Sequence, residues 1–379
     1  MKLEQGPALL QSLGGSMLRS QRTEVVYALL FLAPFLLHLG VFFVFAFVRT
    51  VGFSFTDATL IGQTSRFVGL ANFAELFREP RFLAALTHSI SFMLIVTTLQ
   101  TFLALALAAV LNQRLRGITF FRTVYYVPSV LSSAAVTVIA IWFFQKTGFL
   151  NTFVGYLGAV APVILTFLGL FALIQALQVI LERARGLPVA PTDPALATVS
   201  LGLGLALTWA LVALGWVAPR TPQPPEFTWL TNPDRFLGVP IPLWSIIILN
   251  TFTTIPTLML IFLAGLQDIP KSLYEAASLD GATPLQQFFW VTVPMLRPVT
   301  FLVITLSLIG TLQIFDQVAL MGDAAPLDSI IVLAYYVYNN VFSGEGKVGL
   351  ASAAALVLAG LTFAIVLLQR ALGISEKAH

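Results

Sequence analysis

The chain contains no cysteine, and Asp, Glu, Lys and Arg make up only 10% of its 379 residues, against about 25% in a soluble domain. The missing cysteines exclude disulfide bonds and thiolate metal sites. The sequence also lacks a Gly-x-x-x-x-Gly-Lys-Ser/Thr phosphate loop and a His-Glu-x-x-His zinc motif. We therefore expect no enzyme: no catalytic residue, no metal ligand and no cofactor bound by this chain.

Long apolar blocks fill most of the sequence, and 58% of its residues are hydrophobic. About 20 consecutive apolar residues suffice for a helix to cross a bilayer. The blocks lack the alternation of barrel strands, so helices are expected. The fold class predicted is all-α, a polytopic helical membrane protein with eight spans. The spans are predicted at about residues 25–48, 86–111, 124–144, 161–181, 196–217, 243–266, 296–319 and 348–368.

The distribution of Lys and Arg predicts the orientation of these spans. An even number of spans places both termini on one side, and that side carries twelve Lys and Arg residues against eight opposite. Cytoplasmic loops carry the excess of positive charge. Two short loops, one with Arg114 and Arg116 and one with Arg183 and Arg185, fall on the richer side. We expect both termini to be cytoplasmic.

The loop after the sixth span predicts two short, firmly capped helices. Ser272–Glu275 fits a capping box, and Gly281 falls where a left-handed C-terminal cap is expected. Thr283–Gln286 fits a second capping box, with Pro284 at the first helical position. Such a loop is suited to docking a partner. The apolar side chains expected to face the cytoplasm are Leu273, Tyr274 and Leu279.

The same loop carries a specific spacing: Glu275-Ala-Ala, three residues, Gly281, nine residues, and then Val291–Pro294. It resembles the EAA motif of bacterial ABC importer permeases, which ends in Ile-x-Leu-Pro, and departs from it by valine at the two aliphatic positions. Asp280 also matches the sugar-permease branch, the maltose-type permeases of binding-protein-dependent importers. The resemblance implies a coupling helix that docks on an ATP-binding subunit. The coupling residues it implies are Tyr274, Glu275, Ala276, Ala277, Asp280, Gly281 and Pro294.

Other segments resemble the same family, namely residues 67–73, 115–123, 126–129 and 315–316, whereas 322–326 matches more weakly. The resemblance implies a six-helix core of the type I importer kind, interrupted by two inserted helices. The domains expected are a cytoplasmic tail (1–24), the first part of the core with three spans (25–155), the inserted pair (156–225), the second part of the core (226–372) with its EAA coupling loop at 267–298, and a cytoplasmic tail (373–379). For the inserted pair we favour packing against lipid.

The solute path is expected in the sixth and seventh spans, where hydroxyl side chains are frequent. Sugar sites need hydrogen-bonding groups among apolar or aromatic surfaces. The alternative interpretation is that these hydroxyls join helices to one another. By alignment with the maltose-type family, the resemblance implies as lining positions Thr253, Thr254, Thr257, Ser307, Gly310, Thr311 and Ile314.

The resemblance also implies the partners: a second permease subunit, two ATP-binding subunits that use ATP and Mg, an extracytoplasmic solute-binding protein, and the bilayer of the bacterial inner membrane. The function expected is import of a sugar or related small polar solute by alternating access. The alternative is an ion-coupled secondary transporter, which usually needs acidic residues within its spans. Asp316 is the one candidate, near the end of a span, and His38 fits a packing role better.

Overall fold

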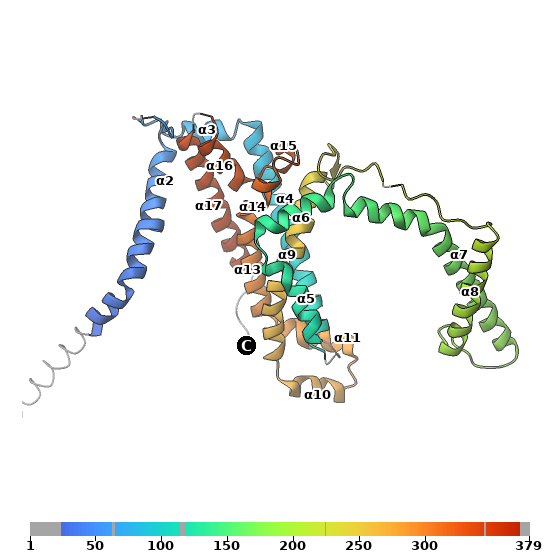
Figure 1. The fold of residues 1–379 in the computed structure, drawn as a ribbon. Helices are drawn as coiled ribbons and strands as arrows, with labels where there is room; N and C mark the ends of the chain where they lie inside the picture. Colours follow the sequence, from blue (N-terminus) through green and yellow to red (C-terminus); the bar gives the residue numbers. More distant parts are fainter. Residues whose placement is uncertain (1–23, 63–64, 114–117, 224, 345, 372–379) are drawn as a thin grey trace, which may run out of the picture. The chain divides into compact units, whose positions relative to one another are not determined.

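The computed structural model describes residues 24–62, 65–113, 118–223, 225–344 and 346–371, and most of them lie in helices (Figure 1). The helices are η1 (Leu39–Phe45, π-helical), α2 (Ala46–Ser54), α3 (Ala71–Leu76), α4 (Pro80–Leu111), α5 (Ile118–Val130), α6 (Ser133–Phe144), α7 (Phe149–Ala184), α8 (Pro194–Ala213), α9 (Ile241–Gln267), α10 (Lys271–Leu279), α11 (Pro284–Gln287), η2 (Phe288–Thr292, π-helical), α12 (Val293–Met295), α13 (Arg297–Leu312), α14 (Asp316–Met321), α15 (Leu327–Ile330), α16 (Leu333–Phe342) and α17 (Val348–Ala371). Two short strands, β1 (Arg235–Phe236) and β2 (Val239–Pro240), pair antiparallel.

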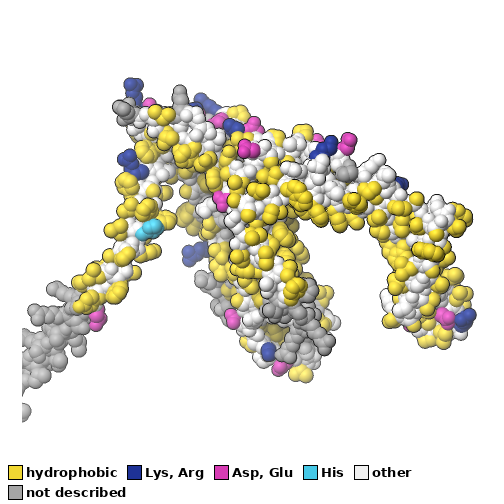
Figure 2. Space-filling model, in the orientation of Figure 1, with side chains coloured by type: hydrophobic (Ala, Val, Ile, Leu, Met, Phe, Trp, Pro, Cys, Tyr) yellow, Lys and Arg dark blue, Asp and Glu magenta, His cyan; other side chains and the backbone are white. Residues whose placement is uncertain are grey.

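Seven helical stretches of the described residues are long and apolar enough to cross a membrane. The all-α, polytopic class is thereby confirmed, while the count differs from the eight spans predicted. The predicted span 124–144 is divided, because α5 ends at Val130 and α6 starts after the N-cap Ser132. Its second half joins α7 in one apolar stretch, Ser133–Ala184. Figure 2 shows hydrophobic side chains over most of the visible helical surface. The predicted tails, apart from residue 24, and the loop with Arg114 and Arg116 lie outside the described residues.

The chain divides into two compact units, and the first comprises residues 24–86 and 333–369 of the described chain. Buried Asn72 joins its segments, because its Nδ2 donates to the backbone oxygens of Ser54 and Thr56, each at 2.8 Å. Gly349 lies so close to this turn that a Cβ would stand 2.0 Å from the oxygen of Thr56. In the same unit, the hydroxyl of fully buried Tyr336 donates to Glu79.

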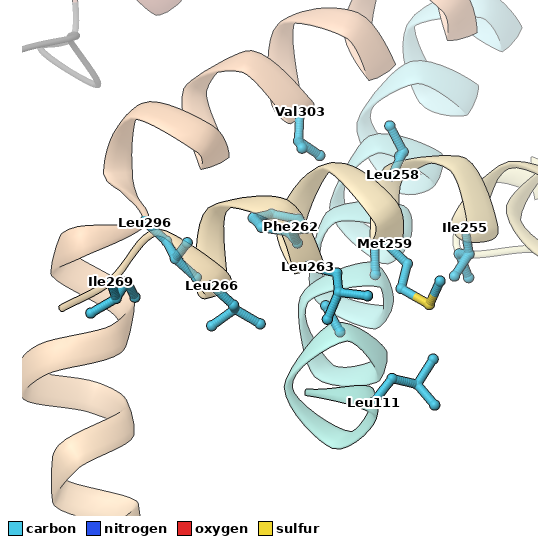
Figure 3. Packing of buried hydrophobic residues seen from close by; sticks show 12 residues of the cluster. Leu111, Ile255, Leu258, Met259, Phe262, Leu263, Leu266, Ile269, Leu296 and Val303 are labelled. Carbon is cyan, nitrogen blue, oxygen red and sulfur yellow. The ribbon is translucent and has the colours of Figure 1, made fainter. Parts of the chain in front are cut away.

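The second unit, residues 87–332 with 370–371, contains both candidate sites. Its core is a cluster of buried apolar side chains from α4, α9 and the α12–α13 segment (Figure 3). Phe262 at its centre is fully buried, and Leu266 and Leu296 extend the cluster to the start of the α10 loop. The close approach of α9 and α13 requires Gly265, because a Cβ there would lie 2.6 Å from Cγ2 of Val299.

The predicted inserted segment forms a helical hairpin of α7 and α8. Asp193 caps the N-terminus of α8 through the amides of Ala195 and Leu196. Within the hairpin, Ser200 Oγ donates to Gln175 Oε1 at 2.7 Å. At Gly204 helix α8 lies against the backbone of α7, where an added Cβ would be in ordinary van der Waals contact, 3.5 Å from the amide nitrogen of Phe171.

Candidate coupling loop and solute path

Helix α10 begins two residues earlier than a capping box at Ser272 requires. Lys271 is its first residue, Pro270 is the N-cap, and no side chain caps this end. The predicted Ser272–Glu275 capping box is therefore wrong, because Ser272 already lies inside the helix. Glu275 is exposed on α10. Its carboxylate has no part in capping and remains free to meet a partner.

The C-terminal end of α10 is a Schellman motif, as the predicted left-handed cap requires. Gly281 has φ +80°, its amide donates to Ser278 O at 3.1 Å, and the amide of Ala282 donates to Ala277 O at 2.9 Å. No atom lies within 4 Å of the position a Cβ of Gly281 would occupy. Within this chain, glycine is needed at 281 for the backbone conformation and not for space.

The predicted second capping box is confirmed at the start of α11. Thr283 N donates to Gln286 Oε1 at 2.8 Å, Gln286 N donates back to Thr283 Oγ1 at 3.4 Å, and Pro284 occupies the first turn. Gln287 then braces the two helices, because its Nε2 donates to Ser278 Oγ at 2.9 Å and to the oxygen of residue 282 at 3.2 Å. The two short helices form one stiff element.

Tyr274 fastens this element to the spans. Its ring packs against the buried cluster of α4, α9 and α13, and its hydroxyl lies 2.9 Å from Thr292 Oγ1 on η2. Of the three side chains predicted to face the cytoplasm, Leu279 is 90% exposed and Leu273 is exposed, but Tyr274 is half-buried. The prediction was wrong for Tyr274 because its ring covers apolar side chains at the base of the loop.

Three of the other predicted coupling residues line an open hollow of about 340 Å³. Ala277, Asp280 and Gly281 line it, and Trp290, which is 80% exposed, forms part of its wall. The exposed acidic side chains and this hollow present a surface to which a protein segment can bind. Ala276 is exposed beside it, whereas Pro294 is half-buried in α12, where the chain turns back towards α13.

Two predicted solute residues, Ser307 and Thr311, are buried in a hydrogen-bonded contact with α4. Ser307 Oγ donates to Thr97 Oγ1 at 3.2 Å and to Gln100 Oε1 at 2.8 Å. Thr311 Oγ1 lies 3.4 Å from Thr97 Oγ1 and donates to the backbone oxygen of Ser307 at 2.7 Å. This geometry favours the alternative interpretation of these hydroxyls, in which they hold helices together.

The same network continues to α9 and α14 through Gln100. Its Nε2 donates to Asn250 Oδ1 at 3.0 Å, and Asn250 Nδ2 donates to Gln317 Oε1 at 3.2 Å. Sequence reasoning missed Gln100, Thr97 and Gln317 as members of a site. The available signal was an isolated carboxamide inside an apolar span, where an unpaired polar group is costly.

The other predicted solute positions lie apart from this network. On α9, Thr257 is exposed and Thr254 is half-buried, while Thr253 donates to the backbone oxygen of Leu249 at 3.0 Å. On α13 itself, Gly310 is exposed, whereas buried Ile314 follows the end of the helix. The structure therefore divides the predicted solute residues into two groups. The buried group is Ser307, Thr311 and Ile314, and the accessible group is Thr254, Thr257 and Gly310. Thr253 is half-buried and forms its hydrogen bond within its own helix.

Comparison with known proteins defines the class. Residues 192–373, which run from α8 to the end of α17 and include the α10–α11 loop, match the family of binding-protein-dependent transport system inner membrane components. The match begins inside the segment predicted to be inserted. The resemblance seen in the sequence is confirmed, because this segment, just under half of the chain, is similar to the permeases of binding-protein-dependent transporters.

Individual relatives agree over nearly the whole chain. The probable ABC transporter permease protein YurN of Bacillus subtilis is 27% identical over 346 residues, covering 90% of this chain and 93% of that protein. The lactose transport system permease protein LacF of Rhizobium radiobacter is 27% identical, covering 83% and 82%. The trehalose/maltose transport system permease protein MalF of Thermococcus litoralis is 27% identical, covering 91% of each.

A solved structure has the same fold. A chain of a bacterial alginate ABC transporter, crystallised with its alginate pentasaccharide-bound periplasmic protein, superposes with a TM-score of 0.62 at 18% identity, covering 92% of this chain and 93% of that chain. The matched family of inner membrane components and the seven membrane-length helices indicate a multi-pass protein of the bacterial inner membrane, similar to the non-catalytic permease subunits of ABC transporters.

Proposed function

We propose that the chain imports a sugar or a related small polar solute by alternating access, driven by ATP hydrolysis on separate subunits. The ATP and Mg are used by two ATP-binding subunits, one of which docks on the α10–α11 loop. A second permease subunit completes the path, and an extracytoplasmic binding protein delivers the solute. Residues 25–155 and 226–372 supply the permease core, with 156–225 inserted into it.

The observation that carries the proposal is the stiff α10–α11 element. Alternating access requires that a movement of the ATPase subunit move the membrane-spanning helices, so the element that joins the two must be rigid. The Schellman turn at Gly281 and the Gln287 brace resist bending of the loop, and Tyr274 joins it to the buried core. An exposed Glu275 supplies a charge for basic groups of the docking subunit.

The solute class is supported by the relatives and by the accessible polar positions. Lactose, trehalose and maltose are named for relatives of similar length, and sn-glycerol-3-phosphate for another. Hydroxyl side chains such as Thr254 and Thr257, set in an otherwise apolar helix, suit an uncharged polyol. No cationic side chain of the described residues lies in the same part of α9 or α13 to favour a phosphate.

Uptake into proteoliposomes tests the proposal. The chain is reconstituted with the permease, ATPase and binding-protein subunits encoded beside it, and labelled lactose, maltose and trehalose are offered in turn. We expect uptake of at least one sugar to require hydrolysable ATP inside the vesicles. Uptake that persists without ATP and stops when ion gradients are collapsed would instead support the secondary transporter.

A further inference from the structure

The accessible face of α9 carries hydroxyl groups at its middle and apolar side chains towards α10. Thr254, at the middle of the helix, is half-buried, and Thr257, one turn closer to α10, is exposed. Towards α10 the same face continues with Leu260 and Ala264, which are also exposed. The helix therefore changes from hydroxyl-bearing to apolar along a single accessible stripe.

Helix α13 shows the same division in the opposite chain direction. Leu302 and Leu306 are exposed near the α10 end of the helix, and Gly310 and Gln313 are exposed near its other end. These four residues recur at helical spacing, so they share one face, which points away from the buried Thr311. Gln313 was not among the predicted solute residues.

Two contacts fix how the helices are aligned. Asn250 on α9 bonds to Gln317 just beyond α13, and Gly265 near the end of α9 packs against Val299 near the start of α13. The helices are therefore antiparallel, and the stretch of α9 that carries its accessible threonines lies level with the polar end of α13. The hydroxyl-bearing stretch of α9 and the Gln313 end of α13 therefore lie at the same level along the two helices. The apolar stretches of the two helices also lie level with each other.

Gln313 is the strongest polar group of this surface. It lies where the span breaks between α13 and α14, and its carboxamide has no hydrogen-bond partner within the described part of the chain. An amide turned towards hydrocarbon costs on the order of several kcal/mol, so its partner comes from outside the chain. Buried carboxamides such as Gln100, by contrast, are paired within it.

We propose that Gln313 is a solute-contacting residue, and that with Thr257 it forms the polar wall of the path, while the apolar stretch around Leu306 lies outside the solute site. This assignment rests on the proposed import function and refines it. A carboxamide donates and accepts hydrogen bonds in one plane, which suits adjacent sugar hydroxyls. Ser307 and Thr311 then act as positioning residues that hold α13 so that its other face meets the solute.

The absence of cysteine allows a direct test in the assembled transporter. Gln313→Cys, Thr257→Cys and, as the matched control on the same face, Leu306→Cys are each reconstituted with the partner subunits. A membrane-impermeant cationic methanethiosulfonate reagent is added from the outside, and labelling of this chain is measured. The cysteine thiolate attacks the reagent, forms a mixed disulfide and releases methanesulfinate. Because the thiolate forms in water and is suppressed in apolar surroundings, we expect positions 313 and 257 to react at least about tenfold faster than 306.

Solute protection completes the test. The transported sugar should slow labelling at 313 and 257 and leave 306 unchanged. Rates at 313 as low as at 306, as expected if Gln313 faces lipid or is sealed against the second permease, would overturn the assignment, and so would labelling that no transported sugar slows. ATP-driven uptake by the unmodified complex is measured in parallel, so failure of the assignment is distinguished from failure of the proposed function.

Discussion

Gly281 shows how a single backbone conformation supports the coupling loop. Its φ of +80° places it in the left-handed region, and no neighbouring atom restricts the space beside it. A residue with a Cβ destabilises the fold by roughly 1 kcal/mol in this conformation, although Asn tolerates it better than Ala does. The turn between α10 and α11 depends on this residue.

Gly281→Ala should therefore weaken coupling more than Gly281→Asn, although asparagine is larger. The reason is that the strain is conformational. The measurement is ATP-driven uptake together with the amount of ATPase subunit that remains bound. Equal loss in both variants would show that side-chain bulk in the docking interface, and not the left-handed turn, makes glycine necessary.

The second prediction at the scale of residues concerns Tyr336, which lies in the first unit and outside the candidate membrane spans. Burial, reinforced by its hydrogen bond to Glu79, raises the pKa of the Tyr336 phenol above its usual range. A folded-state pKa above the unfolded value of about 10 contributes stability that is fully present below pH 10 and is lost as the pH rises further. Tyr336→Phe should lower the Tm at neutral pH and reduce its decline above pH 10. An equal decline of Tm above pH 10 in the unmodified protein and in Tyr336→Phe would contradict this role of Tyr336.

At the scale of elements, local signals predicted more than long-range ones. The Thr283–Gln286 box and the turn at Gly281 were predictable because each depends on a few neighbouring residues. The start of α10 was misplaced by two residues, since Pro270 serves as its N-cap in place of Ser272. The orientation of Tyr274 depends on apolar side chains from other helices, which the local pattern does not reveal.

Long-range packing also limited the prediction of the solute path. The hydroxyl-rich sixth span was recognisable, but which hydroxyls are accessible depends on how α4 packs. Helical spacing placed Ser307 and Thr311 on one face without showing that Thr97 and Gln100 cover it. Gln313 on the opposite face was overlooked for the same reason.

Gln100 is the centre of the network that joins α4, α9 and α13, so its loss should destabilise the permease. Gln100→Leu removes the bonds to Asn250 and Ser307, and we expect a loss of about 1–2 kcal/mol, seen as a lower Tm of the purified complex. Thr98→Val, which removes only a bond within α4, is the control. The double variant Gln100→Leu with Ser307→Ala should lose less stability than the sum of the two single variants, because it leaves fewer unpaired polar groups. Strictly additive losses of stability would argue against a shared network.

At the scale of the whole molecule, the orientation of the spans follows from the charge distribution and from the inserted hairpin. The eight-span prediction counts α5–α6 and α7 as separate crossings, so reporter fusions after Arg183 and after Lys271 should read as cytoplasmic, and a fusion after Pro224 as external. The physical reason is the excess of Lys and Arg on cytoplasmic loops. An external reading after Arg183 would show that the stretch Ser133–Ala184 crosses once, together with α5, and not as two separate spans.

The central claim is that α10 and α11 transmit ATPase movement to the spans. Glu275→Lys inverts an exposed charge at the docking surface without touching the caps of the loop, and Glu182→Lys makes the same charge change in the α7–α8 hairpin. The direct measurement is the amount of ATPase subunit that co-purifies with each variant, together with sugar-stimulated hydrolysis. The account predicts loss of both for Glu275→Lys, with membrane insertion intact, and retention of both for Glu182→Lys. Full retention of ATPase and of stimulated hydrolysis in Glu275→Lys would contradict it.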